Sequence, residues 1–135
     1  MLRFGPAKEL FETRGVADRV ELAPGSFFET VPRGCDGYIL KNILHDWSDD
    51  TSKKILGVVR AAAKPGAKAL LCEMLVDYTS TDYVGTRSDL QMMVACHDGR
   101  ERSLEDLQLL LDESGFAPGR VFRTALGAVV EGVAR

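Results

Sequence analysis

Two compact apolar runs separated by a helical pattern constrain the fold of this chain most. The runs span residues 36–40 (DGYIL) and 67–74 (AKALLCEM) and contain few polar residues. This composition is typical of strands in a parallel sheet that is covered on both faces. Between them, Ser48 is a helix cap, acidic residues follow it, and apolar residues then recur at helical spacing. A strand, a crossover helix and a second strand therefore predict an α/β fold.

Helical and extended patterns alternate along the rest of the chain. The pattern predicts three more helices, at residues 6–14, at 85–95, and from the capping box Ser103-x-x-Asp106 to Gly115. It also predicts a short strand at 19–22 and an antiparallel pair at a sheet edge, formed by 120–126 and 128–133. No Pro/Gly/Ser linker or internal repeat interrupts this order, so we expect one domain over residues 1–135.

Charge and composition exclude several classes of partner. The net charge is −3, and the longest basic run is the pair Lys53-Lys54, so we expect no nucleic acid partner. No apolar stretch reaches the ~18–20 residues of a membrane span, and the first residues do not resemble a signal peptide. We therefore expect a cytoplasmic protein without membrane contact. Three widely spaced cysteines suit neither a disulfide framework nor a zinc site, and predict reduced, mostly buried thiols.

Three ionisable residues are expected at one edge of the sheet. His45 follows the first central strand, Glu73 ends the second, and Glu101 lies in the loop before the capped helix. Ligands of such sheets bind at the carboxyl ends of the strands. An imidazole held by carboxylates is a standard general base. The residues alone leave a second interpretation equally open, in which His45 only donates to backbone at the start of a helix.

Four sequence blocks carry a family resemblance. They are residues 40–50 (LKNILHDWSDD), 64–67 (KPGA), 71–73 (LCE) and 99–103 (GRERS), in this order and evenly spaced. Together they resemble the carboxy-terminal half of the S-adenosylmethionine-dependent O-methyltransferases, of the plant caffeic-acid type and the bacterial natural-product type. The resemblance runs from about Gly15 to the last residue. It implies a truncated Rossmann-like methyltransferase sheet, mostly parallel, with an antiparallel carboxy-terminal hairpin.

The resemblance also implies roles for individual residues. His45 is the base that removes the hydroxyl proton of a small, aromatic acceptor, and Glu73 and Glu101 flank and orient it. The implied cofactor is S-adenosylmethionine, and the reaction requires positioning and one base but no metal. The remaining implied contacts are Lys41 and Trp47 beside the adenosyl group and Met92 against the acceptor ring. Plainer interpretations stay open. Lys41 could serve only to end its strand, and core packing on an amphipathic helix could account for Met92 and is the preferred explanation for Met93.

The chain also departs from the family pattern. It contains no G-x-G, the Gly-rich turn that holds the cofactor in this family. Ser26, which precedes Phe27, stands where the family has an acidic residue that meets the adenine amino group. We therefore expect a partial catalytic domain that lacks the Gly-rich turn and the amino-terminal dimerisation domain. Both Ser26 and Phe27 remain candidate cofactor contacts, but this chain alone is expected to bind S-adenosylmethionine weakly or not at all, and to be inactive.

Two functions from different classes follow. The first is a fragment of an O-methyltransferase, and the alternative is a non-catalytic methyltransferase-like interaction module. A third interpretation is a soluble α/β domain in which the three ionisable residues form a satisfied polar network. The apolar strand at 36–40 is expected to have an unpaired edge without protective lysines or prolines. This predicts a homo-oligomer or a complementing partner chain.

Overall fold

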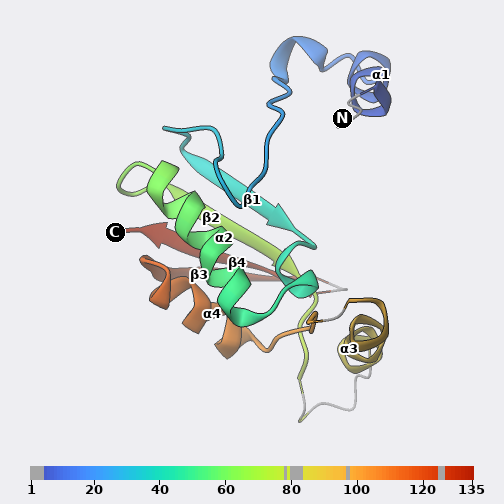
Figure 1. The fold of residues 1–135 in the computed structure, drawn as a ribbon, viewed down its shortest axis with the longest axis vertical. Coiled ribbons are helices and arrows are strands. Elements are labelled where there is room, and N and C mark those ends of the chain that lie inside the picture. Colours follow the sequence, from blue (N-terminus) through green and yellow to red (C-terminus); the bar gives the residue numbers. More distant parts are fainter. Residues whose placement is uncertain (1–4, 78, 80–83, 97, 125–126) are drawn as a thin grey trace.

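The computed structural model describes residues 5–77, 79, 84–96, 98–124 and 127–135. Four strands form one sheet in the order β1-β2-β4-β3 (Figure 1). The strands are β1 (Gly37–Lys41), β2 (Lys68–Glu73), β3 (Phe116–Thr124) and β4 (Gly127–Ala134). The two predicted strands and the carboxy-terminal pair at the sheet edge are therefore confirmed, but β1 lies at an edge of the described sheet and not at its centre.

The prediction of a mostly parallel sheet is wrong for the described chain. Only the β1–β2 pair is parallel, and its two strands are joined by a crossover helix, α2 (Asp49–Ala62). Strand β4 returns directly from β3 and inserts beside β2, so the β2–β4 and β3–β4 pairs are both antiparallel. The result is an α/β fold with a mixed sheet.

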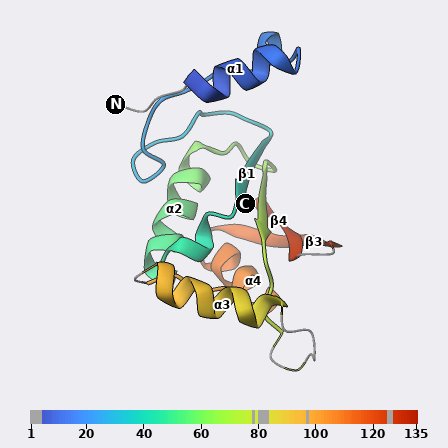
Figure 2. The same cartoon turned by 90° about the vertical axis from the view of Figure 1, so that its right-hand side faces the viewer.

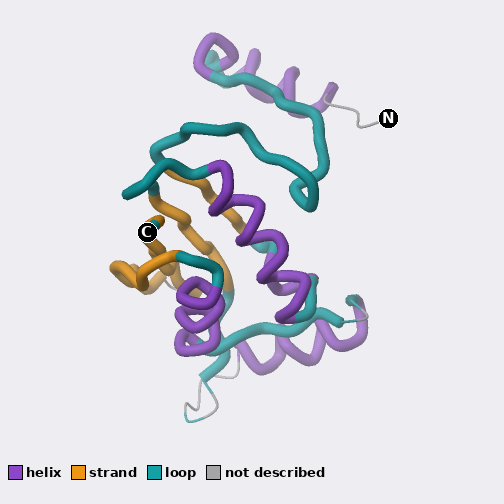
Figure 3. Tube along the Cα trace, turned by 60° about the vertical axis from the view of Figure 1, so that its left-hand side comes forward, coloured by secondary structure: helices purple, strands orange, loops and turns teal. Residues whose placement is uncertain are grey.

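Two helices cover one face of this sheet. Helix α2 and helix α4 (Leu104–Glu113) lie on the same side of the strands (Figures 1 and 3). Alternate residues of β2 point toward them, so Ala69, Leu71 and Glu73 are buried while the residues between them are half-buried. The core consists of these inward residues and the apolar stripes of the two helices, including Ile55, Leu56, Val59, Leu107, Leu110 and Leu111.

The predicted helix ends are confirmed by their hydrogen bonds. The Ser48 hydroxyl accepts from the backbone N–H of Thr51 at the start of α2. Ser103 and Asp106 form the reciprocal capping box of α4. Gly115 follows α4 with a φ of 88°, the left-handed conformation that glycine adopts without strain.

The amino-terminal segment differs from its prediction. Helix α1 (Gly5–Thr13) forms near the expected position and contributes no buried residue; it lies apart from the sheet (Figure 2). The short 3₁₀ helix η1 (Ala17–Arg19) follows it, and residues 20–22 are in no strand. The predicted strand at 19–22 is therefore wrong, because an extended segment becomes a strand only when a partner strand accepts its backbone hydrogen bonds.

Helix α3 (Val84–Ala95) lies beyond the carboxyl ends of β1 and β2 (Figures 1 and 2). The helix itself is confirmed. Its apolar residues Leu90, Met93 and Val94 are exposed, however, and Met93 is 61% exposed, so core packing of Met93 is wrong. The buried positions of α3 are Gly85 and Asp89, which shows that its inward face is partly polar.

Two further expectations concern composition. None of the helices in the described residues is long and apolar enough to cross a membrane. Cys35, Cys72 and Cys96 are free thiols, as predicted, but each is half-buried, so the prediction of mostly buried thiols is wrong. Burial raises the pKa of the Cys72 thiol, which keeps that side chain in its neutral form.

Candidate active site

His45 lies in a short 3₁₀ helix, η2 (Leu44–Asp46), immediately after β1. Asn42 makes the turn between them with a φ of 52°, a left-handed conformation that asparagine tolerates better than most residues. Glu73, the last residue of β2, accepts hydrogen bonds from the backbone N–H groups of Ile43 at 3.1 Å and Leu44 at 2.9 Å. The carboxylate at the end of β2 therefore fixes the turn after β1 that carries His45.

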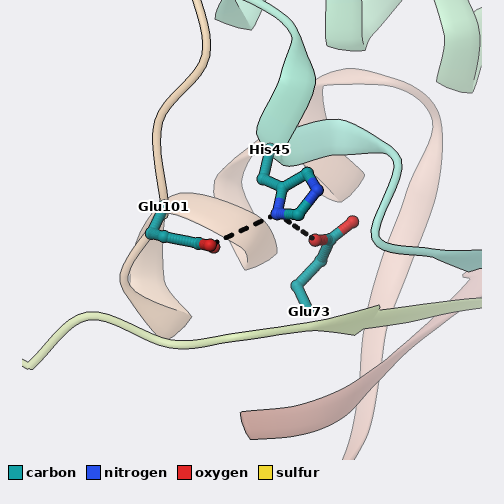
Figure 4. Close-up of side chains that lie close together, drawn as sticks. All are labelled: His45, Glu73 and Glu101. Carbon is teal, nitrogen blue, oxygen red and sulfur yellow. Dashed lines mark hydrogen bonds and ion pairs between the residues drawn. The ribbon is translucent and has the colours of Figure 1, made fainter. Parts of the chain in front are cut away.

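Glu101 reaches the same place from a distant part of the chain. The neighbouring Arg102 forms a parallel bridge with Leu75, and its carbonyl accepts from the N–H of Val76 at 3.1 Å. This pairing places Glu101 beside the continuation of β2. Its Oε1 lies 3.2 Å from Nδ1 of His45, and Oε2 of Glu73 lies 3.9 Å from the same nitrogen (Figure 4). The structure thus brings the imidazole and both carboxylates together.

Burial and hydrogen bonding act in opposite directions on Glu73. Its side chain is 3% exposed, and this burial raises the pKa of the carboxyl group. The N–H groups of Leu44 and Ile43 and the charge of His45 lower the pKa, but they do not cancel the effect of burial, and nearby Glu101 raises it further. The carboxyl group of Glu73 therefore holds a proton more tightly than an exposed glutamate does.

The two nitrogens of His45 have different surroundings. Nδ1 faces oxygen atoms of Glu101 and Glu73, so a proton on Nδ1 is donated to carboxylate. Nε2 lies 3.4 Å from Oδ1 of Asp46, whose side chain is 43% exposed. With Nδ1 protonated, Nε2 carries the free lone pair, which makes it the basic atom of the ring.

Helix α3 supplies polar contacts to Glu101 that sequence reasoning missed. The Ser88 hydroxyl donates to Oε1 of Glu101 at 2.7 Å, and Oδ1 of Asp89 accepts from the backbone N–H of Glu101 at 2.9 Å. The adjacent polar residues Ser88 and Asp89 on the predicted helix were the available signal for these contacts. It was obscured by the helical spacing of Leu90 and Met93, which suggested the opposite face as the inner one.

Arg102 was also missed, and it is buried, with only 2% of the residue exposed. Its guanidinium donates to the carbonyls of Leu44 and Trp47, both at 2.7 Å, one on each side of His45. It also pairs with Asp49 at 2.8 Å. Burial opposes ionisation of Asp49, but hydrogen bonds from Arg102 and Arg100 outweigh it and lower the pKa of that carboxyl group. No local pattern marks an arginine as buried, because arginine is usually a surface residue.

Gly99 permits the close approach of this loop to the histidine. A Cβ atom at Gly99 would lie 2.6 Å from the carbonyl oxygen of His45, which is too close. With glycine there, the next residue donates its backbone N–H to the same carbonyl at 2.9 Å. The loop over residues 99–102 therefore holds the backbone of His45 as well as its ring.

The other candidate residues lie on β1, on α3 and in the loops before β1 and after η2. Lys41 is exposed at the end of β1 and lines a cavity of about 370 Å³ with Glu73 and residues of β4. The ring of Phe28 packs between two residues that were predicted to contact the cofactor. Its centroid lies 4.7 Å from that of Phe27 and 4.9 Å from that of Trp47. The Ser26 hydroxyl accepts from the N–H of Phe28. Met92 is half-buried on α3.

The structure is an α/β domain with a carboxylate-held imidazole at the carboxyl ends of its parallel strands, the edge at which ligands of such sheets bind. The sequence profile of the O-methyltransferase domain matches residues 5–117, so the chain belongs to the O-methyltransferase family. This confirms the resemblance stated on the sequence blocks.

Individual relatives agree with this assignment. The chain is 40% identical to the mitomycin biosynthesis 6-O-methyltransferase of Streptomyces lavendulae over 91% of this chain and 35% of that protein. It is 45% identical to the O-demethylpuromycin-O-methyltransferase of Streptomyces alboniger over 85% of this chain and 31% of that protein. The chain therefore spans about a third of the length of these relatives.

A solved structure of similar fold contains ligands. It is an O-methyltransferase from neocarzinostatin biosynthesis in complex with S-adenosyl-L-homocysteine and 1,4-dihydroxy-2-naphthoic acid. The TM-score is 0.83 at 31% identity, over 96% of this chain and 38% of that one. That protein binds the product form of the methyl donor together with a hydroxylated aromatic acid.

Proposed function

We propose that this chain carries the catalytic base of an S-adenosylmethionine-dependent O-methyltransferase that acts on a hydroxyl of a small aromatic molecule. The observation that carries the proposal is the imidazole of His45 held at Nδ1 by two buried carboxylates. Such an arrangement has a chemical use, because burying two carboxylates is costly unless they serve a partner. A satisfied structural network would not need to leave a basic nitrogen on the ring.

The chain's residues account for the proton transfer. Nε2 of His45 accepts the proton of the acceptor hydroxyl, and Nδ1 keeps its own proton, donated to Glu101. The imidazolium that forms is stabilised by the negative charge of Glu73 and Glu101. Asp46 lies against Nε2 and has an exposed side chain, so it must give up this contact when the hydroxyl binds.

The cofactor supplies an electrophilic methyl group on a sulfonium. The aromatic rings of Phe27 and Phe28 are 38% and 41% exposed and offer apolar faces that fit an adenine ring. Lys41 and Trp47 would border the adenosyl group, Ser26 would offer a hydroxyl to it, and Met92 would contact the acceptor ring. Because a hydroxyl replaces a carboxylate and no G-x-G is present, we expect weak cofactor binding by this chain alone.

The test uses a fusion of this chain to the amino-terminal part of the neocarzinostatin relative, with 1,4-dihydroxy-2-naphthoic acid as acceptor. His45→Ala should lower turnover by roughly 100-fold or more, the scale for loss of a positioned general base, with cofactor affinity nearly unchanged. Glu73→Gln and Glu101→Gln should lose less, because each orients the ring without touching the substrate proton. Turnover and cofactor affinity are measured for all four proteins.

Undiminished turnover of the His45→Ala fusion would overturn the assignment of the base. A fusion that folds and binds the cofactor but transfers no methyl group would favour the alternative, a non-catalytic interaction module. The observation that keeps this second function in view is Ser26, which stands where the family has an acidic residue.

A further inference from the structure

The cluster around His45 holds two buried carboxyl groups for one imidazole. Among the described residues, the ion pairs of Glu73 and Glu101 are with His45 alone. One ligand atom from each of the three side chains lies within 4.8 Å of the others. Two buried carboxylates at this separation repel each other unless a cation lies between them.

Each carboxylate also keeps one oxygen without a hydrogen-bond donor in the described part of the chain. Oε1 of Glu73 is used by the backbone N–H groups of the histidine turn, whereas its Oε2 is buried and unpartnered. Oε1 of Glu101 is used by Ser88 and His45, and its Oε2 is likewise buried and unpartnered. Buried polar atoms of this kind normally have a partner, which indicates a ligand that accepts lone pairs.

We propose that His45, Glu73 and Glu101 form a binding site for a Zn²⁺ ion at Nδ1 of the histidine. Zinc bonds to nitrogen and carboxylate oxygen are ~2.0–2.2 Å long, so tetrahedral ligand atoms lie about 3.4 Å apart. The observed separations from Nδ1 are 3.2 Å to Oε1 of Glu101 and 3.9 Å to Oε2 of Glu73, so small side-chain shifts suffice, and the unpartnered Oε2 of Glu101 belongs to the same carboxylate. Water completes the fourth position, as in zinc sites with three protein ligands.

The ligand set selects among metals. One imidazole and two carboxylates suit Zn²⁺ and its transition-metal neighbours, whereas Mg²⁺ prefers oxygen ligands and keeps most of its water. The sequence groups the three residues at one edge of the sheet but does not mark them as metal ligands, because their wide spacing matches no zinc-binding motif.

The consequence of this site is inhibition, and that part rests on the proposed function. A neutral imidazole bonded to zinc through Nδ1 carries its single proton on Nε2. The proton that Nδ1 donated to Glu101 is then replaced by the metal, and Nε2 no longer has a lone pair for the substrate proton. Zinc at this site therefore blocks the base without covering the substrate side of the ring.

The binding experiment titrates Zn²⁺ into the full chain in competition with a chromophoric chelator. We expect one zinc ion per chain, and at least ~10-fold weaker binding in Glu73→Gln and in Glu101→Gln. Asp46→Asn is the matched control, because Asp46 faces Nε2 instead of Nδ1, and its affinity should equal that of the parent. Absence of zinc binding, or an equal loss in the Asp46→Asn variant, would overturn the site.

A second measurement does not depend on variants. Long-range proton–nitrogen correlation spectra of the parent chain should show that zinc binds Nδ1 of His45 and leaves the proton on Nε2. Zinc on Nε2, or no change at His45, contradicts the proposal. In the active fusion, zinc should inhibit methyl transfer and a chelator should restore it. If the fusion is inactive, only the proposed function fails, because zinc affinity is measured on this chain without the fusion partner.

Discussion

At the scale of single residues, Glu73 combines two opposing demands. Its carboxylate holds the histidine turn through two backbone N–H groups, which requires the charged form to be favourable. Its burial favours the neutral form and raises its pKa above the usual value of 4.5. A group that is held in this way lowers stability at neutral pH, a cost often found where a site needs a particular charge.

Glu73→Gln should therefore stabilise the chain increasingly as pH rises. Because the folded-state pKa of Glu73 is raised, the folded chain binds this proton more tightly than the unfolded chain, and the contribution of Glu73 to stability falls as pH rises above the unfolded value. Urea unfolding from about pH 4 to about pH 8 measures the difference between variant and parent. The control is Glu12→Gln at an exposed site, and an equally flat pH dependence for both variants would contradict the prediction.

Arg102→Lys should destabilise the fold, although it keeps the positive charge. Lysine cannot reproduce the planar fork that reaches the carbonyls of Leu44 and Trp47, so buried acceptors lose their donors. We expect a loss of about 2 kcal/mol or more in the free energy of unfolding. Arg100→Lys is the control, because Arg100 forms ion pairs at a side chain that is 40% exposed, where such pairs contribute little. Similar losses in the two variants would contradict the assignment.

At the scale of elements, helix α4 has a satisfied serine at one end and an unsatisfied one at the other. The Ser103 hydroxyl accepts from the backbone N–H of Asp106 at 3.1 Å, which satisfies a donor that the helix itself leaves free. The Ser114 hydroxyl at the far end is buried with no hydrogen-bond partner among the described residues. The two serine hydroxyls therefore make different contributions to the stability of the fold.

A matched pair of substitutions tests this difference. Ser103→Ala should lower the free energy of unfolding by about 1 kcal/mol, the usual cost of a lost N-cap. Ser114→Ala should be neutral or stabilising, because it removes a buried hydroxyl without breaking a hydrogen bond. Chemical denaturation of both variants gives the two values, and the reverse order would contradict the prediction.

At the scale of the whole molecule, the two edges of the sheet differ in protection. Strand β3 carries Pro118, a register shift between Pro118 and Val121, and exposed arginines, which are features that discourage further strand pairing. Strand β1 pairs only with β2 in the described residues, and Ile39 on it is 70% exposed. Lys41 is the one charged residue of β1, and the residues before it at this edge are Gly37 and three large side chains, Tyr38, Ile39 and Leu40.

We therefore predict a dimer or larger assembly through β1, which Ile39→Lys should shift toward the monomer. A charged residue at a sheet edge opposes pairing with another strand. Light scattering over a dilution series measures the change, and Phe122→Lys on β3 is the control for a partly exposed apolar residue at the other edge. A monomer at every concentration in the parent chain would contradict the prediction and imply that the edge of β1 needs no partner.

Local patterns in the sequence determined which helices form and where they end. Ser48, Ser103 and Gly115 act on backbone groups within a few residues of themselves, so their effects can be read from spacing. The same holds for the apolar runs that became β1 and β2. The order of the family blocks also indicated the O-methyltransferase family before any contact was known.

Tertiary structure decided everything that depends on distant partners. Residues 19–22 have strand composition but no strand beside them, and β4 rather than another parallel strand lies next to β2. The polar side of α3 and the arginine beside Glu101 are buried because loop 99–102 packs against the histidine turn. Hydrogen bonds and ion pairs between segments far apart in the chain leave no periodicity in the sequence, so only the folded chain shows them.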